Sequence, residues 1–364
     1  MDRKIRVGVL FGGRSAEHEV SVSSARSMLE VIDRDQYELV MVGISREGRW
    51  LVAEDAQRLL EAGEVSEGGL VPVALDYMGT RELVGPAGDA DRQSIDVIFP
   101  ILHGPYGEDG TVQGLIELAD VAYVGSGVLG SAVGMDKEMM KRVFKAEGLP
   151  QVEYRVLRRS RWESDRAGVL AELEDQFDYP VFVKPVNLGS SVGVSKADDG
   201  QGLEKAIDEA AQYDYKIVIE AEAAGCREIE VAILGNEEPE ASVVGEIVPG
   251  NEFYDYNAKY VDDNSDSIIP ARVSPATQEA VRAMAIKAFQ AVEAWGLSRV
   301  DFFVRESDEA IFINEINTIP GFTPISMYPK LWEASGVSYG ALVDRLIRLG
   351  MERHEDKQKT RTAR

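Results

Sequence analysis

Residues 299–321 read RVDFFVRESDEAIFINEINTIPG. Two apolar runs, at 300–304 and 310–316, flank a polar turn at 307–309. Apolar runs of this length around a short polar break are typical of a β-hairpin. We therefore expect two antiparallel strands joined by a three-residue loop. One face of the hairpin would be polar and the other would pack in a core.

The expected register gathers polar side chains on one face. A three-residue loop places Asp301 opposite Glu315 and Arg299 opposite Asn317. Two carboxylates with Cβ atoms roughly 5 Å apart repel each other unless a cation lies between them. Oxygen donors of this kind suit Mg²⁺, and the alternative is a solvated acidic edge. We expect Phe303 and Ile313 beside the polar groups, and Phe302, Phe312 and Ile316 on the opposite face.

Length and composition limit the classes of function. A chain of 364 residues predicts two or three domains, and 45% hydrophobic residues are ordinary for a globular protein. A formal net charge of -24 argues against a nucleic-acid or anionic-membrane partner, although a halophilic surface would look the same.

Few residues suggest redox chemistry, zinc binding or membrane insertion. The single cysteine, Cys226, excludes an internal disulfide framework, and His18, His103 and His354 lack zinc spacing. No apolar run reaches the roughly 18 residues of a membrane span, and MDRK leads directly into a strand. We therefore expect a cytoplasmic protein.

The first part of the chain has the pattern of a doubly wound parallel sheet. Strand formers at 5–11 lead into Gly12-Gly13, a helix from about Ser15 and a second strand at 39–44. The loop lacks G-x-G-x-x-G, so a dinucleotide site is not favoured. Residues 46–94 are polar and rich in glycine, and we expect short hairpins there.

Two residues follow strands of this layer. Glu17 lies at the start of the first helix, where the simpler role is that of a capping acid. His103 follows the apolar strand 95–102 and opens the glycine-rich HGPYGEDGTVQG. Open α/β sheets build sites at the carboxyl ends of strands, although most histidines are structural. A helix is expected at about 137–147, with Lys137 as a candidate and Lys141, Arg142 and Lys145 on its surface.

A second glycine-rich segment, YPVFVKPVNLGSSVGVSKA, occupies residues 179–197. It follows a polar helix expected at 161–178. A short strand carries Lys184, and a second strand is expected at 192–195. Small residues between glycines let backbone N–H groups approach an anion, and the lysine adds charge for a phosphate. It is not a Walker loop, and a glycine-rich hairpin without a ligand is the alternative.

The remaining chain adds acidic strand ends and one long loop. Glu220 ends the strand 216–220, and Glu228 begins the strand 228–234, so each could accept from an adenine amino group or a ribose. The irregular segment 250–270 contains Lys259 and Tyr260 and suits a functional lid. We expect further helices at 275–295 and 339–349, followed by a disordered charged tail.

The motifs K-P-x-x-x-G-S-S-V-G, R-E-I-E-V, F-Y-D-Y-x-A-K-Y, R-x-D and N-E-I-N-T-x-P-G occur in this order. With F-G-G-R-S-A-E-H-E-V-S and H-G-P-Y-G-E-D-G, they resemble the ATP-grasp superfamily and, within it, the D-alanine:D-alanine ligases. The resemblance runs from Val7 to about Leu349. It implies an α/β, three-domain ATP-grasp architecture with domains 1–135 (excursion 46–94), 136–225 and 226–364 (lid 250–270). The one departure is VNL at 186–188, with intact spacing.

The resemblance implies that MgATP phosphorylates one D-alanine and that the amine of a second attacks the acyl phosphate. The product would supply peptidoglycan synthesis. A ligase joining D-alanine to D-lactate or another acceptor is the alternative, and Tyr260 is expected to discriminate. A non-catalytic ATP-binding regulator is disfavoured by the metal acids and Arg299. The enzyme is expected to be a homodimer through its first domain.

The resemblance also implies roles for individual residues. For ATP these are Lys137, Lys184 and Lys259 on phosphates, Glu220 on adenine and Glu228 on ribose. For two Mg²⁺ ions, with Mn²⁺ as the alternative, they are Asp301, Glu315 and Asn317. For the first D-alanine they are Glu17 on the ammonium and His103 near the carboxylate, with Ser190 and Tyr260 linked to Glu17. Arg299 and the N–H of Gly321 would stabilise the tetrahedral intermediate, and Ser326 would bind the second carboxylate.

Overall fold

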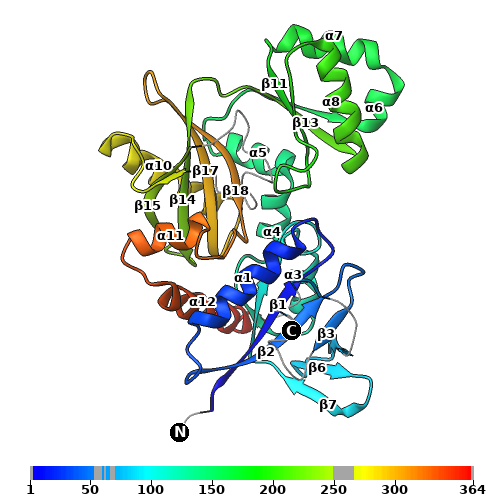
Figure 1. The fold of residues 1–364 in the computed structure, drawn as a ribbon, viewed down its shortest axis with the longest axis vertical. Coiled ribbons are helices and arrows are strands. Elements are labelled where there is room, and N and C mark those ends of the chain that lie inside the picture. Colours follow the sequence, from blue (N-terminus) through cyan, green and yellow to red (C-terminus); the bar gives the residue numbers. More distant parts are fainter. Residues whose placement is uncertain (1–2, 53–59, 61–62, 66–69, 249–265, 362–364) are drawn as a thin grey trace.

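The computed structural model describes residues 3–52, 60, 63–65, 70–248 and 266–361. Its described strands form sheets of six, four, five and three strands. Figure 1 shows an upper lobe with α6, α7 and α8, a central sheet and a lower layer that contains β1 and β2. The predicted α/β class is therefore confirmed. The domain boundaries near residues 135 and 225 stay predictions.

The N-terminal sheet has the order β4-β3-β2-β1-β8-β9, and β2, β1, β8 and β9 run parallel. Helices α1 and α12 pack on one face, and α3 and the small sheet β5-β6-β7 pack on the other. This is the expected doubly wound layer. Its elements are β1 (Ile5–Gly12), α1 (His18–Val31), β2 (Tyr37–Ile44), β3 (Trp50–Val52), β4 (Val71–Pro72), β5 (Ala74–Leu75), β6 (Glu82–Gly85), β7 (Gly88–Ser94), β8 (Val97–Ile101), α3 (Thr111–Leu118), β9 (Ala122–Tyr123) and α4 (Val128–Met135).

The four-stranded sheet β10-β13-β11-β12 is antiparallel and carries α6, α7 and α8 around the buried Trp162. The single helix expected at 161–178 is wrong. Asp165 interrupts it with a φ of -158° and accepts a hydrogen bond from the N–H of Gly168, so a new helix begins there. The elements are β10 (Tyr154–Arg158), α6 (Arg159–Ser164), α7 (Arg166–Gln176), β11 (Val181–Pro185), β12 (Ser195–Ala197), α8 (Gly200–Tyr213) and β13 (Lys216–Ala221).

The five-stranded antiparallel sheet has the order β16-β15-β14-β17-β18. Helices α5 and α10 share one apolar core with it. Ser274 caps α10 by accepting from the N–H of Thr277, and Pro275 occupies its first turn. The elements are α5 (Lys137–Ala146), β14 (Cys226–Gly235), β15 (Glu240–Val248), β16 (Asp266–Ile268), α10 (Pro275–Ala291), β17 (Gly296–Arg305), β18 (Ile311–Asn317), α11 (Met327–Ala334) and α12 (Tyr339–Gln358).

Strands β17 and β18 form the predicted hairpin. Asp301 lies opposite Glu315, and Arg299 lies opposite Asn317, so the expected register is confirmed at the polar end. The loop contains four residues, 306–309, instead of three, because the strands pair one residue out of the expected register near the turn.

A β-bulge between the turn and Asp301 restores the expected register from Asp301 to the open end of the hairpin. Asn314 is the extra residue, so Phe302 pairs with Ile313 and Phe303 pairs with Phe312. Ile313 is fully buried in the core, and the expected placement of Ile313 beside the polar groups is wrong. The placement of Phe312 opposite that face is wrong for the same reason.

The C-terminal helix also differs from expectation. α12 continues to Gln358, although a disordered tail was expected after Leu349. The charged end of the helix packs on the N-terminal layer, where Arg353 donates to the carbonyl of Gly125 at 2.5 Å and Lys357 pairs with Glu117. These contacts order the segment.

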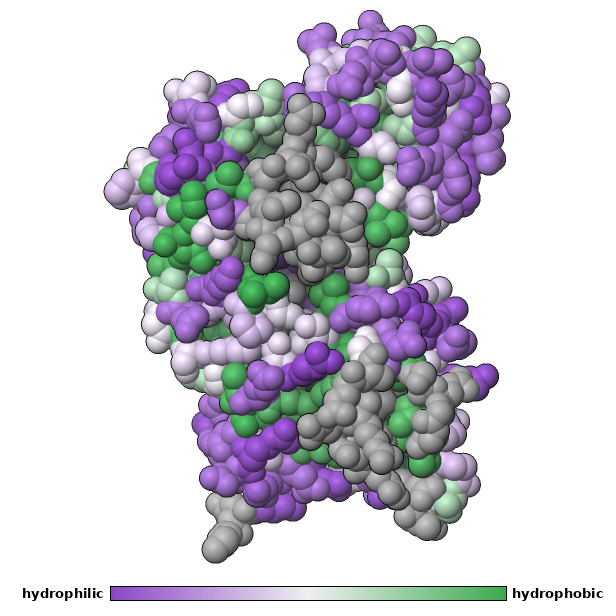
Figure 2. Space-filling model, viewed as in Figure 1, coloured by the Kyte–Doolittle hydropathy of each residue, from purple (hydrophilic) through white to green (hydrophobic). Residues whose placement is uncertain are grey.

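The surface is predominantly hydrophilic over the upper lobe, and the molecule is hollowed between that lobe and the lower body (Figure 2). Within the described part of the chain, no helix combines the length and the apolar character needed to cross a membrane.

Candidate active site

A cavity of about 280 Å³ lies between the four-stranded and five-stranded sheets. Its walls come from α5, the loop that follows β11, and strands β13, β14, β17 and β18. The predicted site residues among those that line it are Lys137, Lys184, Ser190, Glu220, Glu228, Glu315 and Asn317. The structure therefore brings together residues that are up to 180 positions apart in the sequence.

Lys137 reaches into this cavity from the first turn of α5. Asp136 caps that helix by accepting from the N–H of Met139 at 3.0 Å. The ammonium of Lys137 donates to the carbonyl of Leu188 at 2.8 Å and lies 3.7 Å from Glu315 Oε2. Lys137 thus joins the glycine-rich loop to the hairpin.

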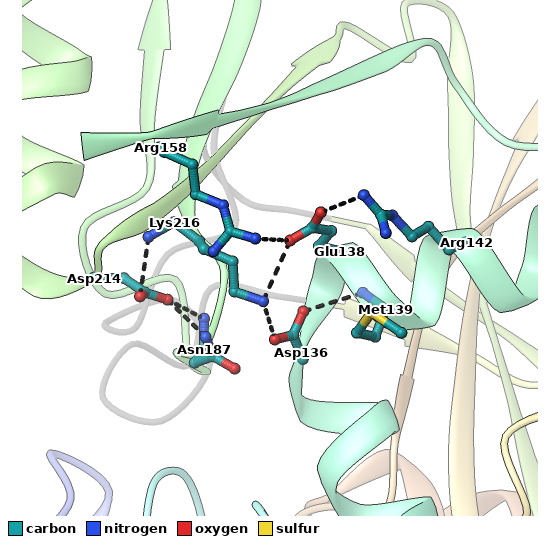
Figure 3. Close-up of polar contacts among 8 residues, drawn as sticks. All are labelled: Asp136, Glu138, Met139, Arg142, Arg158, Asn187, Asp214 and Lys216. Carbon is teal, nitrogen blue, oxygen red and sulfur yellow. Dashed lines mark hydrogen bonds and ion pairs between the residues drawn. The ribbon is translucent and has the colours of Figure 1, made fainter. Parts of the chain in front are cut away.

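A polar network on the other side of α5 holds this helix against the upper lobe (Figure 3). The ammonium of Lys216 on β13 pairs with Asp136 and lies 3.3 Å from Glu138 Oε2. Asp214 accepts from both the backbone N–H and the side-chain amide of Asn187 at 2.8 Å. The network therefore fixes the start of the glycine-rich loop relative to Lys137.

The glycine-rich loop contacts the N-terminal layer. Ser190 and Ser191 have φ angles of 48° and 59°, in the left-handed region that few side chains adopt. The hydroxyl of Ser190 donates to Glu17, which is 7% exposed. A Cβ on Gly189 would lie 3.1 Å from Glu17 Oε2, so the close approach favours glycine.

Three charged groups form a cluster that extends from the cavity wall into the protein interior. Glu220 is 3% exposed, and its two oxygens lie 2.5 Å from the ammonium groups of Lys141 and Lys184. The expectation that Lys141 is an ordinary surface lysine is wrong, because its side chain is 1% exposed and its ammonium pairs with the buried Glu220.

The hairpin acids are already paired with protein cations. Arg299 binds both oxygens of Asp301, with Nε–Oδ1 and Nη2–Oδ2 distances of 2.7 and 2.6 Å, and its Nε lies 3.1 Å from Glu230 Oε2. Glu230 lies opposite Asp301 in the sheet. The amide of Asn317 donates to Asp301 at 3.1 Å. Arg299 thus relieves the repulsion between two of the acids.

The donor set remains suitable for a hard cation. Among the described residues, no three His, Cys, Asp or Glu side chains are arranged to hold a metal ion. Asp301, Glu315 and Asn317 share one face of the hairpin and together offer two carboxylates and one side-chain amide. Mg²⁺ commonly takes few protein ligands and keeps water or phosphate oxygens in its other positions. The residues present therefore fit that ion.

His103 and Glu108 lie beside Glu17. The Nδ1 atom of His103 contacts the carbonyl of Ile319 at 3.0 Å, and its buried Nε2 has no hydrogen-bond partner among the described residues. Burial lowers the pKa of His103 despite the charge of Glu17, so the ring is neutral near pH 7. Burial and then the Glu17 charge raise the pKa of Glu108 to about 8.

The residues that follow the hairpin complete this end of the site. A Cβ on Gly321 would lie 3.0 Å from the hydroxyl of Ser326, so the two predicted residues are neighbours. The hydroxyl of Ser326 accepts from the N–H of Thr323 at 3.2 Å. Lys259 and Tyr260, with most of the predicted lid, lie outside the described residues.

Comparison with known proteins identifies the family. The model of the D-ala D-ala ligase N-terminus matches residues 6–126, and that of the D-ala D-ala ligase C-terminus matches residues 143–348. The chain belongs to the D-ala D-ala ligase family. A D-alanine--D-alanine ligase of Natranaerobius thermophilus is 48% identical over 99% of this chain and 98% of its own length. One of Geobacillus thermodenitrificans is 48% identical over 98% of both chains.

Solved structures of D-Ala-D-Ala ligases and their relatives share the fold. The D-alanine-D-alanine ligase from Coxiella burnetii matches with a TM-score of 0.86 and 37% identity, over 98% of this chain and 97% of its own. A D-Ala:D-Ser ligase from Enterococcus faecalis matches with a TM-score of 0.86 and 33% identity, over 96% of this chain and 100% of its own. The predicted ligase class of the ATP-grasp type is confirmed, and the family implies D-alanine and ATP as substrates.

Sequence reasoning missed four polar residues of this D-Ala-D-Ala ligase site. Glu230 could have been found, because it shares the strand face of Glu228 two residues away. Lys141 gave no local signal, because its partner Glu220 lies on the distant strand β13. Glu108 lies within the quoted H-G-P-Y-G-E-D-G motif and accepts from the N–H of Gly104 in the same loop, so the motif could have marked it. Asp214 gave no distinguishing pattern, because its partner Asn187 lies on another element.

Proposed function

We propose that the chain joins two molecules of D-alanine into D-alanyl-D-alanine and converts ATP into ADP and phosphate. The observation that carries this function is the hydrogen bond between Ser190 and Glu17. It connects a cavity that contains lysines suited to phosphates with a buried acid suited to an amino-acid ammonium.

The reaction requires two steps. A carboxylate oxygen of the first D-alanine attacks the γ-phosphorus, and ADP leaves. The neutral amine of the second D-alanine then attacks the carbonyl carbon, loses a proton, and expels phosphate with that oxygen. Phosphoryl transfer depends mainly on positioning and charge neutralisation, which Lys137 and Lys184 are placed to supply. We assign the adenine to Glu220 and the ribose to Glu228.

Asp301, Glu315 and Asn317 would hold two Mg²⁺ ions, with Mn²⁺ as the alternative. Bound there, the ions would neutralise charge on the phosphate oxygens. Arg299 lies on the same face, and we assign to it and to the N–H of Gly321 the stabilisation of the tetrahedral oxyanion.

The substrate subsites follow from the cluster around Glu17. This carboxylate would pair with the ammonium of the first D-alanine, next to His103. Ser326 would bind the carboxylate of the second D-alanine. Lys259 and Tyr260 are assigned to the γ-phosphate and to the acceptor subsite on their motif alone.

The product is a precursor of peptidoglycan, and we propose a cytoplasmic location for the reaction because it consumes ATP. We also propose a homodimer formed through the N-terminal layer. Exposed apolar side chains on α3 and α4, Leu118 and Leu129, are available there at 73% and 61% exposure. Light scattering coupled to size exclusion would test the dimer, and a monomer at working concentration would contradict it.

Acceptor profiling tests the proposed reaction. The enzyme is given ATP, Mg²⁺ and D-alanine, alone or with D-lactate or D-serine in equal amounts, and products are measured by mass. We expect D-alanyl-D-alanine as the main product at pH 7 in every mixture. A predominant ester or D-alanyl-D-serine would assign the chain to a different acceptor.

A further inference from the structure

Lys141 has no role in the function proposed above, although it is 1% exposed and belongs to the buried cluster with Glu220 and Lys184. Glu220 and Lys184 line the cavity. Lys141 lies on the far side of the Glu220 carboxylate, and its ammonium is 5.2 Å from the ring centre of Tyr154. The cluster therefore reaches from the cavity wall into the protein interior.

A single carboxylate compensates only one of the two lysines. Burial acts to raise the pKa of Glu220, but the ammonium groups of Lys141 and Lys184 outweigh it and hold that pKa well below its usual range. Burial likewise acts to lower the pKa of Lys184, but the carboxylates of Glu220, Glu315 and Glu228, with Glu220 foremost, outweigh burial and raise that pKa. Glu220 and Lys184 are therefore ionised. With Lys141 counted at its formal charge, the two lysines and one carboxylate sum to a net charge of plus one.

This charge matters because the cavity is rich in acids. Besides Glu220, the acids Glu222, Glu228 and Glu315 line it, whereas the pKa of Glu108, raised to about 8, leaves that residue largely uncharged near pH 7. A nucleotide phosphate is repelled by such a wall unless cations outweigh it. If Lys184 and Glu220 formed an isolated pair, they would cancel each other. Lys141 neutralises Glu220 from behind and leaves the charge of Lys184 available to the ligand.

We propose that Lys141 is a positioning residue that sets the net charge of the phosphate subsite. It touches neither nucleotide nor substrate and acts through Glu220 on Lys184. The inference rests on the proposed function, because it assigns the phosphates of the nucleotide to this part of the cavity.

Four variants separate this role from a purely structural one. Lys141→Met gives the cluster a net charge of zero, Glu220→Gln gives plus two, and the double variant returns it to plus one. Lys145→Met removes an exposed lysine from the same helix and is the matched control. Calorimetry measures the dissociation constants of adenosine and of ADP at one Mg²⁺ concentration. The dissociation constant of adenosine divided by that of ADP reports how much the phosphates contribute to binding. Any effect of Glu220 on adenine cancels in this ratio.

We expect Lys141→Met to lower the ratio about tenfold, the factor that one unit charge produces at roughly 12 Å in a dielectric of about 20. Glu220→Gln should raise the ratio, and the double variant and Lys145→Met should keep it within about twofold of wild type. Equal losses for adenosine and ADP in Lys141→Met, or no recovery in the double variant, would overturn the inference.

The test still works if Lys141→Met does not fold. Glu220→Gln and the double variant leave no buried carboxylate without a cation, so both can be compared. A higher ratio in Glu220→Gln than in the double variant would show that Lys141 acts through its charge. If Glu220→Gln did not exceed the double variant, the inference would be wrong. Failure of the wild-type protein to bind ADP at all would instead refute the proposed function.

Discussion

Replacing Ser190 with alanine and with glycine should separate a hydrogen bond from backbone strain at the same position. The hydroxyl of Ser190 donates to the buried Glu17, and the residue has a φ of 48°. Alanine removes the hydroxyl and keeps the Cβ that makes this φ unfavourable. Glycine removes both.

The magnitudes follow from these two features. A hydrogen bond to a charged group contributes about 1.5–3 kcal/mol, so Ser190→Ala should lower the free energy of unfolding by that amount. A Cβ in the left-handed region costs about 1–2 kcal/mol. The greater freedom of glycine in the unfolded chain offsets about 0.4–1 kcal/mol of this. Ser190→Gly should therefore be more stable than Ser190→Ala by roughly 0.5–1 kcal/mol.

Urea unfolding of both variants, followed by circular dichroism, measures this difference. Steady-state kinetics should show a KM for D-alanine about tenfold higher in both variants, because each loses the hydrogen bond that orients Glu17. Ser195→Ala is the matched control, since it removes a 3.0 Å hydrogen bond to Glu209 at an exposed position. It should change stability by about 0.5 kcal/mol or less.

Equal stability of the two Ser190 variants would refute the argument from backbone strain. An unchanged KM for D-alanine in both would refute the link between Ser190 and substrate binding. A loss in Ser195→Ala as large as that in Ser190→Ala would show that burial of the acceptor does not determine the magnitude.

Three further outcomes are expected. Burial and the charge of Glu17 raise the pKa of Glu108 to about 8 from 4.5, so the unfolding free energy of wild type relative to Glu108→Gln should fall between these pH values; a constant difference in urea unfolding would contradict this. Lys216→Met leaves Asp136 and Glu138 with less positive charge nearby and should lower the free energy of unfolding by about 3 kcal/mol. The same substitution should cost less stability in a protein that already carries Glu138→Gln, and losses that simply add in the double variant would argue against the network. Glu315→Gln should lower kcat by on the order of 100-fold and raise the Mg²⁺ concentration for half-maximal rate, whereas unchanged turnover at saturating Mg²⁺ would exclude this residue as a metal ligand.

The hairpin shows how far the sequence determines the site. Alternation and the polar turn predicted Asp301 opposite Glu315. The loop is one residue longer than expected, and the bulge at Asn314 compensates, so two errors cancelled at the polar end. The position of Ile313, which pairs with Phe302 and lies in the core, was not predicted, because no local pattern marks a bulge within an apolar strand.

Local sequence patterns could not predict contacts between residues that lie far apart in the chain. Lys141 appeared to be a surface lysine because its partner, Glu220, lies on a strand 79 positions away. The end of α12 appeared disordered because Arg353 and Lys357 find their partners on the N-terminal layer. Charged segments become ordered when such partners are present, and composition alone does not reveal them.

Transfer of oxygen from D-alanine to phosphate tests the central claim most directly. D-alanine labelled with ¹⁸O in both carboxylate oxygens is incubated with the enzyme, ATP and Mg²⁺, and the phosphate and dipeptide are measured by mass. An acyl-phosphate route predicts one ¹⁸O atom in each phosphate released and one D-alanyl-D-alanine for each ADP. Unlabelled phosphate, or release of phosphate without dipeptide, would contradict the assignment of this cavity to D-alanine ligation.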